Sequence, residues 1–262
     1  MLEAVTILLE TKKENHITEV MENVKVSEGV WHITVKAPKL AQAAKPGQFV
    51  QVLVEGAGLL LRRPLGIAGA DAEQGTVELF YRVLGKGTAK LTGYRAGDSL
   101  SILGPLGHGF DTSAGNVLIV GGGMGLAPTK FLAERLEHCE ALLGGRNAGE
   151  LFWTKYYEPA TEAMHITTDD GSMGTKGFTV AVLPELLATG KYDRVAVCGP
   201  EIMMRKTFEI CREQGIPCEV SLEKRMACGL GACLSCNIDS TDGRRLHVCQ
   251  DGPVFRGEEV FA

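Results

Sequence analysis

Four cysteines near the C-terminal end of the sequence have the type and spacing needed to bind an iron–sulfur cluster. They follow the pattern C-x4-C-x2-C, with one more cysteine after a gap of 12 residues: Cys228, Cys233, Cys236 and Cys249. Four thiolates hold the two irons of a [2Fe–2S] cluster, and this spacing is the plant-type ferredoxin signature. Small residues between the cysteines let the backbone curl around a cluster and point N–H groups at its sulfurs. The spacing therefore predicts one-electron redox chemistry.

Two other uses of these cysteines are weighed against the cluster. Zinc sites favour paired C-x2-C knuckles, and this stretch has a single such pair. Buried cysteines that only pack in a core show no regular spacing. We interpret the isolated Cys139, Cys211 and Cys218 as packed thiols of this kind. A disulfide framework is typical of short secreted chains, whereas the N-terminus here has an early acid and no basic region of a secretory signal. The cluster is the favoured prediction.

Composition narrows the class of protein further. The chain has 262 residues, 45% of them hydrophobic and 23% charged, which is typical of a globular protein of one to three domains. A net charge of −5 with no basic run argues against nucleic acid as a partner. No run approaches 18 apolar residues, so no transmembrane helix and no membrane partner are predicted. Cysteines without an export signal predict the reducing cytoplasm.

A glycine-rich turn is the next candidate site. It follows the apolar run 116–120 and precedes a helix opened by Pro128, and its glycines are Gly121, Gly122, Gly123 and Gly125. Glycines there permit close approach of a pyrophosphate, which the N–H groups and positive end of the helix attract. Ala127 and Pro128 replace the end of a full G-x-G-x-x-G motif, and glycine is also common in such turns for steric reasons. Its position at the first β-α turn favours dinucleotide binding.

Two more stretches offer ligand contacts. Cys198-Gly199-Pro200 ends a later strand, and ligands of open α/β sheets bind at the carboxyl ends of strands. Taken alone, the stretch is better explained as a small buried cysteine before a helix, and we predict no nucleophilic role. Arg62-Arg63-Pro64 interrupts the β region and is either a phosphate site or a charged strand start. An aromatic residue, a cation and a Gly-Thr turn follow: Tyr81, Arg82 and Gly85–Thr88.

The elements that must position these residues fall into two regions. Short alternating stretches separated by Gly and Pro turns predict a small antiparallel β-barrel over 17–110, with strands near 30–35, 48–54, 76–83 and 99–103. Beyond residue 116, apolar strands alternate with helices over 128–138, 149–157, 178–187 and 201–214. This alternation predicts a doubly wound parallel sheet. Residues 1–16 carry no functional prediction.

These features together resemble the ferredoxin–NADP reductase superfamily. Within it, the likeness is to the electron-transfer subunits of the two-subunit, NAD-dependent (type B) dihydroorotate dehydrogenases of bacteria. The resemblance covers roughly residues 17–262. Its most specific stretches are 222–236 and 248–255, supported by 104–110 and 169–177.

The resemblance assigns cofactors to the predicted sites. The family's flavin motif corresponds to Arg63-Pro64-Leu65-Gly66, where Gly66 departs from the usual hydroxyl residue. Further FAD contacts are implied at Phe80, Tyr81, Arg82, Gly87 and Thr88, and NAD contacts at Gly121–Pro128 and Cys198-Gly199-Pro200. All four cluster ligands match, with no departure. NAD over NADP depends on the resemblance alone, because Arg146 could bind a 2′-phosphate.

The expected architecture is multidomain, β plus α/β: an FAD-binding β-barrel (1–112), an NAD-binding domain (113–222) and a small [2Fe–2S] segment (223–262). The resemblance implies that electrons from a partner subunit containing FMN, in a heterotetramer of two plus two, pass through the cluster and FAD to NAD+ in pyrimidine biosynthesis. No acid–base residue is nominated, because the cofactors carry the redox chemistry. Open alternatives are a ferredoxin:NADP or hydrogenase subunit, a stand-alone reductase, and a zinc-stabilised nucleotide sensor.

Overall fold

Alternating apolar residues in the first half of the chain fill the interior of a closed barrel, in a computed structural model that describes residues 13–56 and 58–262. Val50 and Val52, for example, are fully buried in it. The strands pair antiparallel in the order β1-β2-β5-β4-β3-β6. They are β1 (Glu14–Ser27), β2 (Val30–Lys36), β3 (Phe49–Leu53), β4 (Arg63–Asp71), β5 (Thr76–Arg82) and β6 (Ser99–Leu106). The predicted antiparallel barrel is confirmed. Residues 1–12, for which no function was predicted, lie outside the described residues.

The arginine pair was interpreted either as a phosphate site or as a charged strand start, and a strand does start there: β4 begins at Arg63 and continues to Asp71. Proline is tolerated because Pro64 is the second residue of the strand and pairs with β3 alone, while pairing with β5 starts only at Ile67. Two short helices, α2 (Pro38–Ala43) and α3 (Lys86–Leu91), connect the strands.

A doubly wound sheet forms the second half of the chain. Its strand order is β10-β9-β8-β7-β11-β12-β15, parallel except for the last strand. The bounds are β7 (Asn116–Gly122), β8 (His138–Gly145), β9 (Ala163–Thr168), β10 (Thr175–Lys176), β11 (Arg194–Cys198), β12 (Cys218–Ser221) and β15 (Val254–Arg256). Strands such as β11 are buried along their whole length, as expected for a sheet covered on both faces.

Helices cover the two faces of this sheet. On one face lie α4 (Leu126–Ala133), which follows the 3-10 turn η1 (Gly123–Gly125), and α5 (Thr154–Tyr157), which lies between η2 (Ala148–Leu151) and η3 (Glu158–Ala160). On the other lie α6 (Thr179–Leu187) and α7 (Glu201–Glu213). The helix predicted over 128–138 ends at Ala133, because the chain must turn before His138 starts β8 opposite Asn116. The helix predicted over 149–157 is broken into short turns. No helix among the described residues is long and apolar enough to cross a membrane.

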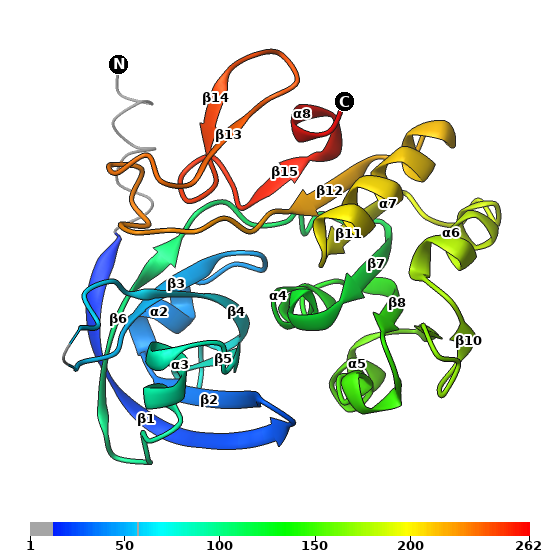
Figure 1. The fold of residues 1–262 in the computed structure, drawn as a ribbon. Coiled ribbons are helices and arrows are strands. Elements are labelled where there is room, and N and C mark those ends of the chain that lie inside the picture. Colours follow the sequence, from blue (N-terminus) through cyan, green and yellow to red (C-terminus); the bar gives the residue numbers. More distant parts are fainter. Residues whose placement is uncertain (1–12, 57) are drawn as a thin grey trace.

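The C-terminal segment lies across the top of both the barrel and the sheet (Figure 1). It contains a small hairpin, β13 (Asn237–Asp239) and β14 (Arg245–His247), and then returns through β15 to a last turn of helix, α8 (Gly257–Val260). β15 pairs antiparallel with β12, so the end of this segment is part of the sheet. The three-part division at residues 112 and 222 stays a prediction.

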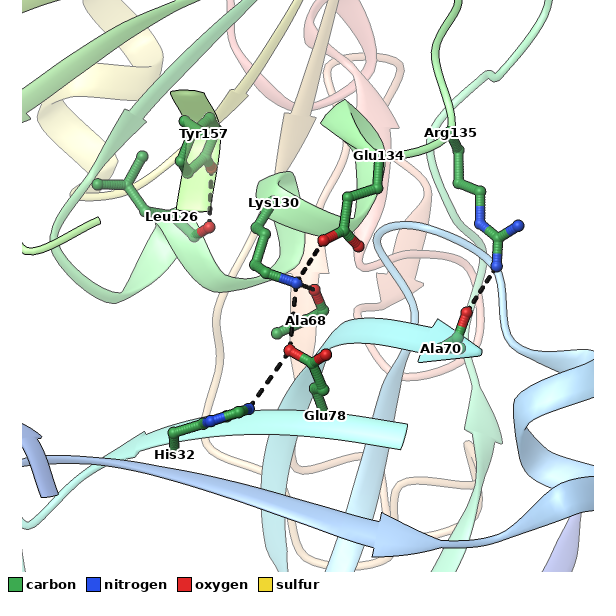
Figure 2. Close-up of polar contacts among 9 residues, drawn as sticks. All are labelled: His32, Ala68, Ala70, Glu78, Leu126, Lys130, Glu134, Arg135 and Tyr157. Carbon is green, nitrogen blue, oxygen red and sulfur yellow. Dashed lines mark hydrogen bonds and ion pairs between the residues drawn. The ribbon is translucent and has the colours of Figure 1, made fainter. Parts of the chain in front are cut away.

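A buried lysine joins the barrel to the sheet domain (Figure 2). Lys130 of α4 is only 5% exposed, and its Nζ lies 3.2 Å from Glu78 Oε2 of β5 and 2.6 Å from Glu134 Oε1. It also donates to the Ala68 carbonyl of β4, and His32 Nε2 lies 3.3 Å from the same Glu78 oxygen. Burial acts to raise the pKa of Glu78, but His32 and Lys130 outweigh it and lower this pKa to about 2. The contacts fix how the two domains face each other.

Candidate functional site

Most of the predicted ligand residues line one cavity of about 1080 Å³ between the barrel, the sheet and the C-terminal segment. Those that line it are Pro64, Leu65, Gly66, Phe80, Tyr81, Arg82, Gly122, Gly123, Gly125, Cys198, Gly199 and Pro200. Met226, Asn237 and Ile238 of the C-terminal segment complete the wall. Stretches far apart in sequence thus meet at one place that is large enough for a flavin and a nicotinamide ring.

The two turns predicted for the nicotinamide nucleotide lie in direct contact. β7 and β11 are neighbouring parallel strands, and the strand order reverses between them, which is where open α/β sheets bind ligands. A Cβ on Gly125 would lie only 2.4 Å from the Cys198 carbonyl oxygen, so glycine is required for this approach. Gly123 has a φ of +59°, which favours glycine. Gly121 does not line the cavity; its missing Cβ makes room for Leu126 of α4.

Cys198 is unsuited to nucleophilic chemistry. The side chain is 3% exposed, and burial raises the pKa of its thiol to about 12. A thiol of this kind is neutral near pH 7 and acts as a small packing group beside the ligand. The position at a strand end agrees with the sequence analysis, and the expectation that Cys198 is no nucleophile is consistent with this environment.

Glu223 is a cavity residue that the sequence analysis did not single out. It follows β12, and its pKa is raised by partial burial in the cavity wall. The residue as a whole remains exposed, so solvent screening keeps this shift small. The rule that ligands gather at the carboxyl ends of parallel strands would have found Glu223, because β12 ends at Ser221.

The structure separates the two adjacent arginines. Arg62 is structural: its guanidinium donates to the carbonyls of Gln51 and Ser101 and ties β3 to β6. Arg63 instead packs over the first turn of α3, where a Cβ on Gly87 would lie 2.0 Å from Arg63 Nε. Two stretches predicted separately to bind phosphate, Arg63 and Gly87-Thr88, are therefore side by side, just outside the cavity lining. The Thr88 hydroxyl caps the start of this helix by accepting from the N–H of Leu84 and Gly85.

The side chains of β5 alternate between two environments. Tyr81 faces the barrel core, where its hydroxyl donates to Asn23 at 2.9 Å, and burial raises its pKa to about 12. Phe80 points the other way, stacked on His32 with ring centroids 4.4 Å apart. Arg82 shares that outer face, and its buried Nε has no hydrogen-bond partner among the described residues. An unpaired cationic donor in the cavity wall fits the phosphates or polar ring edge of FAD.

The four cysteines come from a single loop and the segment after β14. Cys236 and Cys249 are buried in the apolar core below the loop, Cys228 is half-buried and Cys233 is exposed. The Ser235 hydroxyl lies 3.1 Å from the Cys233 sulfur and lowers the pKa of this cysteine to about 6. Burial and the neighbouring Cys236 thiol raise that of Cys249 to about 12.

The backbone of this loop fits a cluster. The N–H of Leu230 donates to Cys228 Sγ at 3.3 Å and the N–H of Gly231 donates to Cys249 Sγ at 3.2 Å. Gly229 and Gly231 both have left-handed φ angles, which bend the loop around the sulfurs. No three His, Cys, Asp or Glu side chains within 13–56 and 58–262 are placed to hold a single metal ion. The fit to a [2Fe–2S] cluster therefore depends on the four-thiol donor set and the N–H groups aimed at it.

Comparison with known proteins defines the class first. A ferredoxin NADP+ reductase from Neisseria gonorrhoeae with bound FAD and NADP has the same fold, with a TM-score of 0.60 at 17% identity, over 78% of this chain and 93% of that one. A model of the oxidoreductase FAD-binding domain matches residues 17–110. The first match shows the fold, and the second shows that the barrel is an oxidoreductase FAD-binding domain, so the protein is a flavoprotein oxidoreductase.

Further matches identify a family within this class of flavoproteins. A model of the iron–sulfur cluster binding domain of dihydroorotate dehydrogenase B matches residues 223–261. The electron transfer subunit of dihydroorotate dehydrogenase B (NAD(+)) from Clostridium acetobutylicum is 37% identical, over 95% of this chain and 98% of that protein. Its counterpart from Geobacillus thermodenitrificans is 39% identical, over 90% of this chain and 94% of that protein. The chain belongs to the family of dihydroorotate dehydrogenase B electron transfer subunits, which confirms the resemblance stated from sequence.

Proposed function

We propose that this chain carries electrons from the FMN of a dihydroorotate dehydrogenase catalytic subunit to NAD+, during pyrimidine biosynthesis. The observation that carries the proposal is the shared cavity: its walls come from the flavin-type strands β4 and β5, the nucleotide-type turns after β7 and β11, and the cluster segment. When bound there, the cluster would supply one-electron transfer, and FAD would convert single electrons into the hydride that NAD+ accepts.

The residues of the chain would hold and orient these groups. Arg63, over the first turn of α3, would bind the FAD pyrophosphate, and Arg82 would offer its unpaired Nε to the same cofactor. Pro64, Leu65 and Gly66 would shape the side of the flavin ring. A Cβ at Gly66 would lie 3.4 Å from Pro128 Cβ, which is ordinary van der Waals contact, so crowding does not explain why the usual hydroxyl residue is replaced by glycine.

The nicotinamide nucleotide would bind on the opposite wall. The N–H groups of the Gly122–Gly125 turn would face its pyrophosphate, and Cys198-Gly199 would lie beside the nicotinamide. Arg146, the candidate for a 2′-phosphate, is engaged by Glu150: its Nε donates to Glu150 Oε1 at 2.7 Å and its backbone N–H to Glu150 Oε2 at 3.0 Å. Because this pair is exposed, the choice of NAD+ over NADP+ is inferred from the relatives, which are named as NAD(+) enzymes.

The assembly completes the proposal. The catalytic partner contains FMN, and two copies of each subunit form a heterotetramer. We place this assembly in the cytoplasm, where thiolate ligands and free cysteines stay reduced.

Reconstitution tests the function. The chain, purified without oxygen, is mixed with the FMN-bearing catalytic subunit, dihydroorotate and NAD+, and NADH absorbance is followed. NADH is expected only when both subunits are present. If the chain oxidises NADH with artificial acceptors but never couples to dihydroorotate, the cofactor assignments stand and the partner is wrong.

A second function is favoured by one comparison. A solved NADH-dependent reduced ferredoxin–NADP oxidoreductase matches this chain with a TM-score of 0.84 at 34% identity, over 94% of this chain and 90% of that one. A role as the FAD- and cluster-bearing subunit of a ferredoxin:NADP complex would give NADPH-dependent ferredoxin chemistry and no dihydroorotate coupling. The same reconstitution, repeated with reduced ferredoxin and NADP+, separates the two.

Loss of the Arg63 guanidinium is expected to weaken FAD binding. In Arg63→Ala, the pyrophosphate loses a charge-assisted contact, which is worth about 1.5–3 kcal/mol and weakens FAD affinity by roughly 10- to 100-fold. Flavin retained after gel filtration, read at its visible absorbance, measures the effect. Arg95→Ala is the matched control, because Arg95 donates to the carbonyls of Thr92 and Tyr94 on the barrel. Equal flavin retention in both variants would remove Arg63 from the site.

A further inference from the structure

A fully buried glutamine lies between the barrel and the cluster loop. Gln51 of β3 is 0% exposed, and neither Nε2 nor Oε1 of its side chain has a hydrogen-bond partner among the described residues. An unpaired buried amide costs roughly 1–3 kcal/mol, so native proteins rarely keep one without a use. The amide therefore points to a partner that is not part of the chain.

Strand geometry shows which way this amide faces. Val50 and Val52 belong to the core inside the barrel, so the alternate residues Phe49 and Gln51 face outward. Phe49 packs in the same apolar cluster as Cys236 and Cys249. Gln51 is therefore a polar side chain on a face of β3 whose other outward residue, Phe49, is apolar and belongs to the core cluster that includes two of the cysteines.

The nearest part of that segment is the loop at Cys228. The Gln51 side chain lies across Gly229: a Cβ at Gly229 would be 2.8 Å from both Gln51 Cγ and Gln51 Nε2. Gly229 is fixed as glycine both by this contact and by its φ of +71°. It directly follows Cys228, whose sulfur already accepts from the Leu230 N–H. The amide thus reaches the part of the loop where a cluster sulfur would be held.

We propose that the Gln51 side-chain amide donates a hydrogen bond to the sulfur shell of the cluster beside Cys228, and so sets its reduction potential. The proposal rests on the cluster assignment made above. An N–H donor stabilises the more negative, reduced cluster and raises its potential. Gln51 also pairs in register with Pro64 of the flavin wall, so the same strand residue would lie between the two redox sites.

The test measures the cluster itself and needs no partner subunit. Gln51→Met keeps the length of the side chain and removes the donor. A redox titration of the isolated protein, followed by the EPR signal of the reduced cluster, is compared with wild type at equal iron content. The variant is expected to disfavour the reduced cluster about tenfold, which is a fall of about 59 mV for a one-electron couple.

Gln48→Leu is the matched control. Gln48 is also buried, at 5% exposure, and lies three residues away, but its amide donates to the Gly107 carbonyl and its oxygen accepts from the Lys45 N–H. This variant should be less stable and leave the potential unchanged. An unchanged potential in Gln51→Met, or an equal fall in both variants, would overturn the proposal.

A second variant covers poor loading of the first. Gln51→Leu also removes the donor and adds no charge, and a potential below that of wild type again supports the donor role, while an unchanged one refutes it. If wild type itself binds no iron, the cluster assignment fails. That outcome is distinct from a cluster that is present but whose potential does not change when Gln51 is replaced.

Discussion

Replacing Cys233 by alanine is expected to abolish NAD+ reduction by dihydroorotate in the two-subunit assay, while NADH oxidation with artificial acceptors continues. The variant loses one of four thiolate ligands, and it is the exposed one whose pKa of about 6 makes it thiolate near neutral pH. Loss of an outer contact to a metal site typically costs 10- to 100-fold, so loss of a ligand should exceed about 100-fold in coupled rate. Iron content and the EPR signal should fall with it.

The matched control is Cys139→Ala. Cys139 is a buried thiol of β8, and burial raises its pKa to about 11, which marks it as a packing group. Its loss should lower stability slightly and leave iron content unchanged. Full iron content and normal coupling in Cys233→Ala would show that this cysteine is no ligand and that the predicted signature was misassigned.

Removing the buried lysine between the barrel and the sheet is expected to destabilise the protein strongly. Lys130→Met leaves Glu78 and Glu134 facing each other without their shared cation. Both carboxylates are about one third exposed, so the cost should be roughly 2–3 kcal/mol, below the 3–5 kcal/mol of a fully buried pair. The thermal midpoint of the loaded protein should fall by roughly 5–10 °C.

The stability that Glu78 contributes through its pair with Lys130 depends on pH. The pKa of Glu78 in the fold, about 2, lies below its ordinary 4.5, so its contribution is complete above pH 4.5 and is lost as the pH falls toward 2. The gap between wild type and Lys130→Met should therefore narrow over that range. Lys206→Met is the control, because its exposed pair with Glu209 should contribute less than about 0.5 kcal/mol. Equal losses in the two variants would contradict the role of Lys130.

Local patterns were enough for much of the site. Three parts of the site could be predicted from neighbouring residues alone. They are the cysteine spacing, the glycine turn after an apolar strand and the strand end at Cys198. The barrel and the doubly wound sheet also follow from alternation and from the order of strands and helices. These features required only periodicity, turn residues and motif spacing.

What could not be predicted depends on contacts between distant segments. Lys130 lies in an otherwise apolar helix with no local sign of its burial against β5. Gln51 occupies a strand position where a polar residue suggests solvent, yet it is fully buried and the cluster loop at Gly229 lies against it. The sequence left the start of β4 open, because two arginines and a proline fit a phosphate site as well as a strand that pairs on one side at its beginning. Each depends on which surfaces meet, and periodicity carries no information about that.

The pairing of β15 with β12 means that the cluster segment is held to the sheet at both of its ends. Ser221, the last residue of β12, stands opposite Val254, the first of β15, so the chain leaves and re-enters the sheet at adjacent points. The segment is topologically an insertion between neighbouring strands, although the sequence places it like a tail. A cut in the hairpin at Asp242-Gly243 would leave both fragments anchored to the same sheet. The terminal strand β15 therefore anchors the end of the cysteine segment to the same sheet from which the segment starts.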